Sequence, residues 1–125
     1  MLKQKELLIM KNNRGQVLVL FIMILPVIFI GIACIIDSSY MMYQKNRLDN
    51  INLDVLNSVK DEINVSEEEI RDLIILNDAK IVNEDISINE TITIDNYILV
   101  DSIFGRIIGL DEYKISSSIS VNYNN

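Results

Sequence analysis

Hydrophobic and polar residues divide this chain into an amino-terminal part with one long apolar run and a carboxyl-terminal part with shorter repeating patterns. Residues 17–36 contain no charged side chain. At about 1.5 Å rise per residue, a helix of that length crosses roughly 30 Å of hydrocarbon, enough to span a bilayer. A cleaved secretory signal has a shorter apolar stretch with a small-residue site after it, whereas Asp37 and polar residues follow here. The pattern predicts a retained transmembrane helix.

A second apolar pattern follows the run at helical spacing. Residues 37–63 contain neither proline nor glycine, so we expect the helix to continue beyond the membrane as a stalk. One stripe of apolar side chains recurs along it every three or four residues. The stripe consists of Leu48, Ile51, Val55, Val59 and Ile63. It needs a cover, which could be the chain's own downstream sheet or a helix of a partner.

The remaining residues predict a small head of helices and strands. Ser66 to Glu69 has the spacing of a capping box and predicts a helix that runs to about Leu76. Strict alternation predicts a half-buried strand over 86–95, near an edge where Glu90 interrupts the apolar face. Helical spacing over 97–108 with Gly109 as the stop, then alternation over 113–123, predicts a helix and a last strand. Residues 79–82 could add a short strand.

Together these elements predict an α+β fold, with a single N-terminal transmembrane helix that continues into a helical stalk and is packed by a small sheet. Strand, helix and strand suggest a crossover unit, although such a helix could also connect antiparallel strands. The expected parts are a basic leader at 1–16, a transmembrane helix at 17–36, a stalk at 37–64 and the head at 65–125.

Charge predicts the orientation of this protein in a membrane. The net charge of −7 divides into a basic leader, with Lys3, Lys5, Lys11 and Arg14 against Glu6, and a strongly acidic remainder. The positive-inside rule therefore places the N-terminus in the cytoplasm and the C-terminal domain outside, with the chain as a single-pass protein of the cytoplasmic membrane. The acidic remainder would repel phosphates, so nucleic acid is not an expected partner.

The residue types offer little for catalysis. The chain has no histidine, which removes histidine triads, most zinc sites and imidazole acid–base chemistry. Its one cysteine, Cys34, lies within the apolar run, and no glycine-rich phosphate loop is present. We expect no enzyme activity, no cofactor, no metal and no small-molecule substrate. An anchored enzyme would have to rely on Lys114 beside the serines of the last strand.

The apolar run also contains residues suited to helix packing. Pro26 lies at its middle, where a neighbouring helix could compensate for the lost hydrogen bond. Gly31, Ala33 and Cys34 form a turn of small side chains on which a second helix could approach closely.

Two separated stretches resemble the TadE/TadG-like proteins of tight-adherence (Flp, type IVc) pilus systems. The first is RGQ, the apolar run with its central proline, and then IIDSSYMMYQKNRLDN. Its matching positions are Arg14, Gly15, Pro26, Asp37, Tyr40, Arg47, Leu48 and Asn50. The second is IFGRIIGLDEYKISSSISV, in which Phe104, Arg106 and Gly109 match the family's phenylalanine, basic residue and glycine before the final strand.

The resemblance implies a bitopic, minor pilin-like subunit that acts by helix packing and protein contact. Its expected partners are the lipid bilayer, other pilin-like subunits and the assembly platform, and Asp37 could pair with a basic group on a neighbour. The plain alternative for Asp37 is a solvated aspartate at the membrane boundary. Processed members are cleaved before a residue like Gln16, after a glycine like Gly15, but carry a glutamate where this chain has Leu20, so a retained leader is expected.

A second class of function stays open from the sequence. A generic signal-anchored binding or regulatory protein would share the anchor and the acidic head, and Asn64-Val-Ser66 and Asn89-Glu-Thr91 match the glycosylation pattern.

Overall fold

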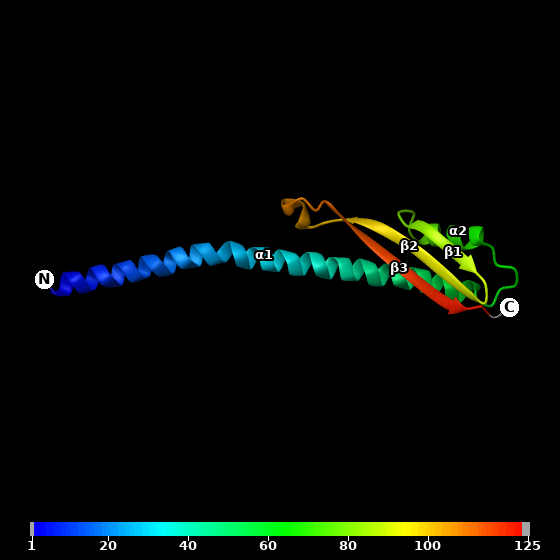
Figure 1. Cartoon of the computed structure of the whole chain (residues 1–125), viewed down its shortest axis with the longest axis horizontal. Helices are drawn as coiled ribbons and strands as arrows, with labels where there is room; N and C mark the ends of the chain where they lie inside the picture. The colour runs from blue at the N-terminus through cyan, green and yellow to red at the C-terminus, as the bar shows by residue number, and fades with distance from the viewer. Residues whose placement is uncertain (1, 124–125) are drawn as a thin grey trace. The chain divides into compact units, whose positions relative to one another are not determined.

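A computed structural model describes residues 2–123, with side chains described from residue 14 onward. The basic side chains of the leader, Lys3, Lys5 and Lys11, therefore lie outside the described residues. The elements in chain order are α1 (Leu2–Val59), α2 (Glu67–Asn77), β1 (Val82–Ile88), β2 (Thr91–Asp101), the 3₁₀ helix η1 (Gly105–Ile108) and β3 (Glu112–Asn122) (Figure 1). The expected α+β class is confirmed, with a long apolar N-terminal helix, a second helix and a three-stranded antiparallel sheet.

The chain divides into two compact units, Met1–Ile35 and Ile36–Asn125. In the first unit the structure describes helix alone, and α1 continues through Pro26. The second unit contains the carboxyl-terminal part of α1 and every other element. We call residues 36–59 of α1 the stalk and the elements that follow it the head.

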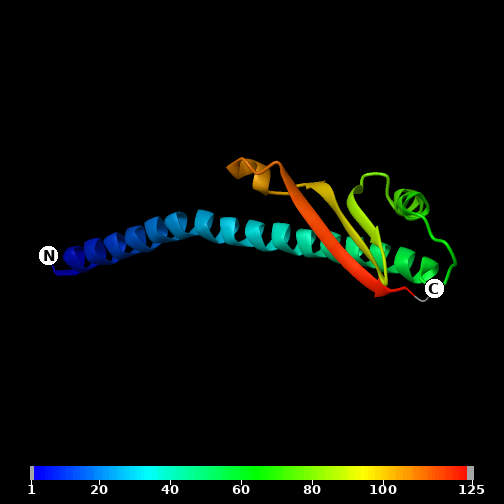
Figure 2. The same ribbon diagram turned by 45° about the vertical axis from the view of Figure 1, so that its right-hand side comes forward.

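The stalk and the head share one hydrophobic core. Leu48, Val55, Leu56 and Val59 of the stalk are at most 4% exposed. They belong to the same cluster as buried side chains of α2 and of all three strands, including Ile70, Ile74, Ile86, Ile92, Ile94, Ile98 and Ile115. The sheet lies along the stalk in both views (Figures 1 and 2). The apolar stripe of the stalk is thus covered by the chain's own sheet, one of the two covers considered.

The stripe ends earlier than its spacing suggests. α1 stops at Val59, and Ile63 lies in the following turn, where it is 79% exposed. Asn64 there has a left-handed backbone with φ of 61°. The Tyr123 hydroxyl donates to the Glu62 carbonyl at 2.9 Å and accepts from the Val65 backbone N–H at 3.3 Å. These contacts hold the turn away from helical geometry.

The helix that the capping box predicts is confirmed. Ser66 is the N-cap of α2, and its hydroxyl accepts from the Glu69 backbone N–H at 3.2 Å. This contact satisfies one of the amides that the first turn of a helix leaves free. α2 ends at Asn77, close to the expected Leu76, and its buried residues Ile70 and Ile74 face the core.

The prediction of one continuous strand over 86–95 is wrong, because the chain folds back within it, although residues 86–88 and 91–95 do lie in strands. β1 and β2 form an antiparallel hairpin in which Ile88 pairs with Ile92, and Glu90 lies in the turn. Directly opposed residues in an antiparallel pair point to the same face. The three residues between Ile88 and Ile92 therefore preserve the alternation and leave no sign of the turn in the pattern. The proposed short strand at 79–82 is also wrong, since β1 begins at Val82.

The predicted helix over 97–108 is wrong for a different reason. Residues 97–101 extend β2, with Ile98 and Val100 buried, and they pair with β3 in register from Tyr97↔Ser116 to Asp101↔Glu112. Pairing along the whole length of β3 outweighs a weak helical pattern. Only the four residues of η1 remain helical, and the left-handed stop expected at Gly109 is present with φ of 88°. The sheet order β1-β2-β3 is wholly antiparallel, so the crossover alternative does not apply.

Candidate functional site

The apolar run is the largest exposed hydrophobic surface that the structure describes. The large apolar side chains from Val17 to Ile36 are mostly between 39% and 68% exposed. Among the described residues, α1 is long and apolar enough to cross a membrane. Fifteen leucine, isoleucine, phenylalanine and valine residues in 17–36 would each favour insertion by about 0.3–0.6 kcal/mol, which amounts to about 5–9 kcal/mol.

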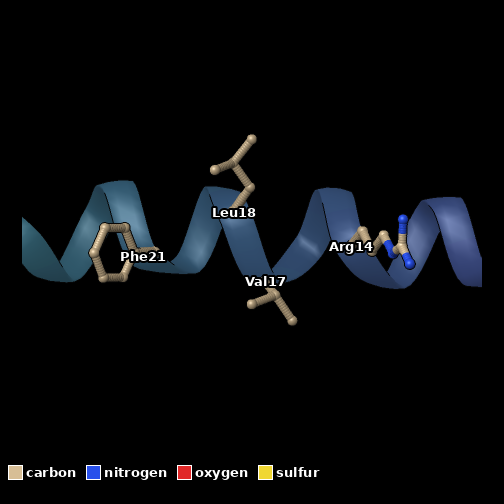
Figure 3. Close-up of a pocket in the computed structure, with 4 residues that line it drawn as sticks. All are labelled: Arg14, Val17, Leu18 and Phe21. Carbon is tan, nitrogen blue, oxygen red and sulfur yellow. The ribbon is translucent and has the colours of Figure 1, made fainter.

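A shallow hollow on this helix is not a ligand site. It is lined by Arg14, Val17, Leu18 and Phe21, which lie within two turns of α1. Figure 3 shows these side chains fanning out around a single helix rather than converging, with Val17 and Leu18 on opposite sides. No second element closes the hollow in this view, so it offers a small molecule no enclosed walls.

The first charged residue after the apolar run has an unexpected environment. Asp37 is only 5% exposed. Its Oδ1 accepts from the Phe104 backbone N–H at 2.9 Å, and its Oδ2 accepts from the Gly105 backbone N–H at 2.7 Å. The Tyr113 hydroxyl donates to Oδ2 at 2.7 Å. The interpretation of Asp37 as a solvated aspartate is therefore wrong, since a turn of the same chain surrounds the carboxylate.

The hydrogen bonds to Asp37 favour its charged form. Burial alone would raise the pKa of Asp37, because it penalises the charge. The Tyr113 hydroxyl and the backbone N–H groups of Phe104, Gly105 and Ile103 outweigh that effect and hold the pKa below its ordinary value. Amides at the start of η1 would otherwise lack partners, so the carboxylate and the turn satisfy one another.

Gly105 permits this close approach. A Cβ at this position would lie 2.9 Å from the Leu110 carbonyl oxygen and 3.1 Å from Asp37 Oδ2, and it would collide with the Tyr113 hydroxyl. Any side chain there must displace the Tyr113 hydroxyl and shift the backbone of the turn, and it would crowd the carboxylate. Sequence reasoning singled out Gly109 and missed both Gly105 and Tyr113. A glycine in the middle of the apolar 103–108 pattern was the available sign.

The residues matched in the second stretch of the resemblance build the turn that holds Asp37. The Phe104 backbone N–H contacts the carboxylate, Gly109 ends η1, and the Arg106 guanidinium donates to the Ser102 carbonyl at 3.4 Å. Asp37 belongs to the first matched stretch. The structure thus brings together two stretches that are 67 residues apart.

A buried pair of asparagines forms a second polar contact between the stalk and the sheet. Asn52 is fully buried and Asn96 of β2 is 2% exposed. Each side-chain amide donates to the other's carbonyl oxygen at 2.8 Å, and Asn96 also donates to the Asn83 side chain at 3.2 Å. Among residues 14–123, no buried side-chain nitrogen or oxygen lacks a hydrogen-bond partner. Neither Asn52 nor Asn96 was predicted as a functional residue.

The middle of the stalk makes further polar contacts with the head. Lys45 Nζ donates to the Ser116 carbonyl at 2.6 Å and lies 3.2 Å from Asp49, which also accepts from the Ser117 hydroxyl. Arg47 pairs with Asp78 at 2.9 Å. Such partly exposed ion pairs contribute little stability, so their main effect is on orientation.

The candidate positions on α1 fall into two groups. Leu48, Val55 and Val59 are core residues and Ile51 packs partly buried against them. Gly15, Gln16, Pro26 and Gly31 are exposed, and Ala33 is intermediate. A methyl group added at Gly15 or Gly31 would meet no atom within 4 Å. No other part of the described chain therefore packs against α1 at Gly15 or Gly31.

No group of three or more aspartate, glutamate, cysteine or histidine side chains within the described part of the chain could hold a metal ion. No protein-family model, curated protein or solved structure matches this chain. Function must therefore be argued from the exposed apolar helix and from the contacts that join the head to its stalk.

Proposed function

We propose that this chain is a bitopic membrane component of a tight-adherence pilus assembly or secretion machine, minor pilin-like and related to the TadE/TadG-like proteins. The N-terminus would be cytoplasmic, the helix at 17–36 would cross the cytoplasmic membrane, and the head would be extracytoplasmic. It would act without catalysis, through packing of its apolar helix on other pilin-like subunits and the assembly platform.

One observation carries this proposal. The apolar run belongs to the same helix, Leu2–Val59, as the stalk on which the head is folded. The apolar stripe of the stalk packs against the head of the same chain. The side chains of the apolar run, in contrast, are exposed around the helix. A subunit of this kind can pack through the run while its head remains folded, because the two surfaces do not compete. The choice of a tight-adherence pilus system rests on the resemblance of two stretches of the sequence to TadE/TadG-like proteins.

Site-specific photocrosslinking in the host that encodes the chain tests the proposal. A photoreactive amino acid at Phe29, which is 61% exposed in the run, should capture another single-helix membrane subunit of the pilus machinery. The same amino acid at Ile63, which is 79% exposed in the head, provides the control for non-specific capture. A protease should remove a C-terminal tag from cells whose outer envelope layers have been removed and whose cytoplasmic membrane is intact, as expected for an extracytoplasmic head.

The outcomes separate the two classes of function. Capture of pilus subunits from Phe29, with loss of surface pili when the gene is deleted, would support the assembly role. An external tag together with lipid adducts alone from Phe29 would favour the generic anchored protein. A tag that is cleaved only after the cytoplasmic membrane itself is opened would refute the orientation and the proposal with it.

A further inference from the structure

The turn that holds Asp37 exposes a cluster of large apolar side chains. We call residues 103–110, which contain η1, the apolar loop. Its members are 36–79% exposed: Ile103 (45%), Phe104 (36%), Ile107 (79%), Ile108 (71%) and Leu110 (49%). The loop forms the tip of the β2–β3 hairpin, at the opposite end of these strands from the pair Thr91 and Asn122 (Figures 1 and 2). Isolated exposed apolar residues are ordinary, but five within eight positions form a patch.

The Asp37 contact fixes the height of the apolar loop along the helix. Asp37 directly follows Ile36, the last residue of the apolar run, and a helix rises only about 1.5 Å per residue. Hydrogen bonds of 2.7–2.9 Å join Asp37 to Phe104, Gly105 and Tyr113. Ile36, Asp37 and the loop all belong to the same compact unit. The loop therefore lies level with the residue at which the apolar run ends.

The helix surface at this level has the composition of a membrane interface. Ile36 is 39% exposed, and Met42 and Tyr43 on the next turns of α1 are 66% and 62% exposed. Tyrosine is enriched at the boundary between lipid and water. The loop contains one basic residue, Arg106, and the acidic residues Asp101, Asp111 and Glu112 flank it. Attraction to anionic lipid is therefore not its driving force, and burial of apolar surface is.

We infer that the apolar loop inserts into the headgroup and acyl-chain boundary of the outer leaflet, as a second membrane contact beside the transmembrane helix. This inference rests on the proposed membrane span, because the loop reaches lipid only if the run does. The head would then be held against the bilayer surface by both the stalk and the loop. A protein partner is the competing cover, and the position of the loop beside the end of the run favours lipid.

Lipid-borne quenching tests the inference on the full chain. In a Cys34→Ser background, single cysteines at Ile107, Ile63 and Phe29 carry an environment-sensitive fluorophore. The protein is reconstituted at low density into phosphatidylcholine vesicles, with and without a nitroxide-labelled phosphatidylcholine. Ile107 and Ile63 are both 79% exposed, so they form a matched pair. The label at Ile107 should shift to the blue and lose intensity to the nitroxide, whereas the label at Ile63 should do neither.

The label at Phe29 distinguishes failure of the inference from failure of the span. Quenching at Phe29 but not at Ile107 would overturn loop insertion and leave the span intact. Absence of quenching at both would overturn the span and the inference together. A blue shift at Ile107 without quenching by the nitroxide would show that protein covers the loop. A shift that requires added phosphatidylglycerol would replace apolar insertion with a phosphate contact at Arg106. The last two results would each overturn the inference.

Discussion

Replacement of Asn52 by alanine should lower the free energy of unfolding of the head by about 2–4 kcal/mol. The change removes both 2.8 Å hydrogen bonds of the asparagine pair and leaves the Asn96 carbonyl oxygen buried without its partner. An unsatisfied buried polar group costs about 1–3 kcal/mol, and the missing side-chain atoms leave a small cavity that adds to it. Asn96 keeps its bond to Asn83, which limits the loss.

Hydrogen exchange of β2 amides, measured on the full chain in phosphatidylcholine nanodiscs, gives the opening free energy of the head. Asn57→Ala on the exposed side of the same helix is the control and should change it by less than about 0.5 kcal/mol. The double variant Asn52→Leu with Asn96→Leu should recover much of the loss, because both buried amides are removed and Asn83, which is only partly buried, can bond to water instead. An Asn52→Ala effect no larger than the control would refute the reasoning, as would a double variant as unstable as the single one.

Three further variants test the remaining contacts. Gly105→Ala should increase exchange at the apolar loop because its methyl group collides with the Tyr113 hydroxyl, whereas Gly31→Ala, with open space around it, should not. The pKa of Asp37 is lowered on folding, so its contribution to stability is present above the unfolded pKa of about 3.9 and is lost as the pH falls through the folded value. The protection of the loop amides, corrected for the intrinsic exchange rate at each pH, should therefore fall below about pH 4, and a pH profile of Asp37→Asn that keeps the same step would contradict this. Val55→Asp should destabilise the head by about 3–5 kcal/mol, because it buries an unpaired carboxylate. Leu53→Asp, at a 40% exposed site on the same helix, should be tolerated in limited proteolysis, and equal resistance of both variants would place Val55 in solvent.

The sequence predicts those elements whose determinants are local. The apolar run, the capping box at Ser66 and the alternation of the last strand each lie within a few turns or one strand. For these, the residues that form the element also carry the pattern. The class of the fold and the apolar stripe of the stalk could therefore be predicted from the sequence.

The hairpin between β1 and β2 could not be predicted, because the three residues between the paired Ile88 and Ile92 preserve the period of two. The end of β2 was misread as helix, since the pairing that decides it lies in β3, more than ten residues further along the chain. In both cases a partner strand, rather than the local pattern, determines the structure.

The contact at Asp37 shows the same limit for the candidate site. The sequence marks four of its residues as candidates, but in two separate stretches: Asp37 in the first, and Phe104, Arg106 and Gly109 in the second. Their meeting depends on the hairpin length that brings η1 back to the stalk, and on Gly105, whose missing side chain admits the carboxylate. No spacing in the sequence reports a contact across 67 residues.

Polar contacts fix the position and orientation of the sheet on the stalk helix. Apolar packing between the stalk and the strands is non-directional, so the core alone would tolerate a shift of the sheet along or around the helix. The Asp37 carboxylate near one end and the Asn52–Asn96 pair further along have directional partners, and a shift would leave buried polar groups unpaired at both. A single buried asparagine fixes register in coiled coils by the same logic. The two contacts therefore hold the apolar loop at the first turn beyond the run, the position that the inferred insertion into the outer leaflet requires.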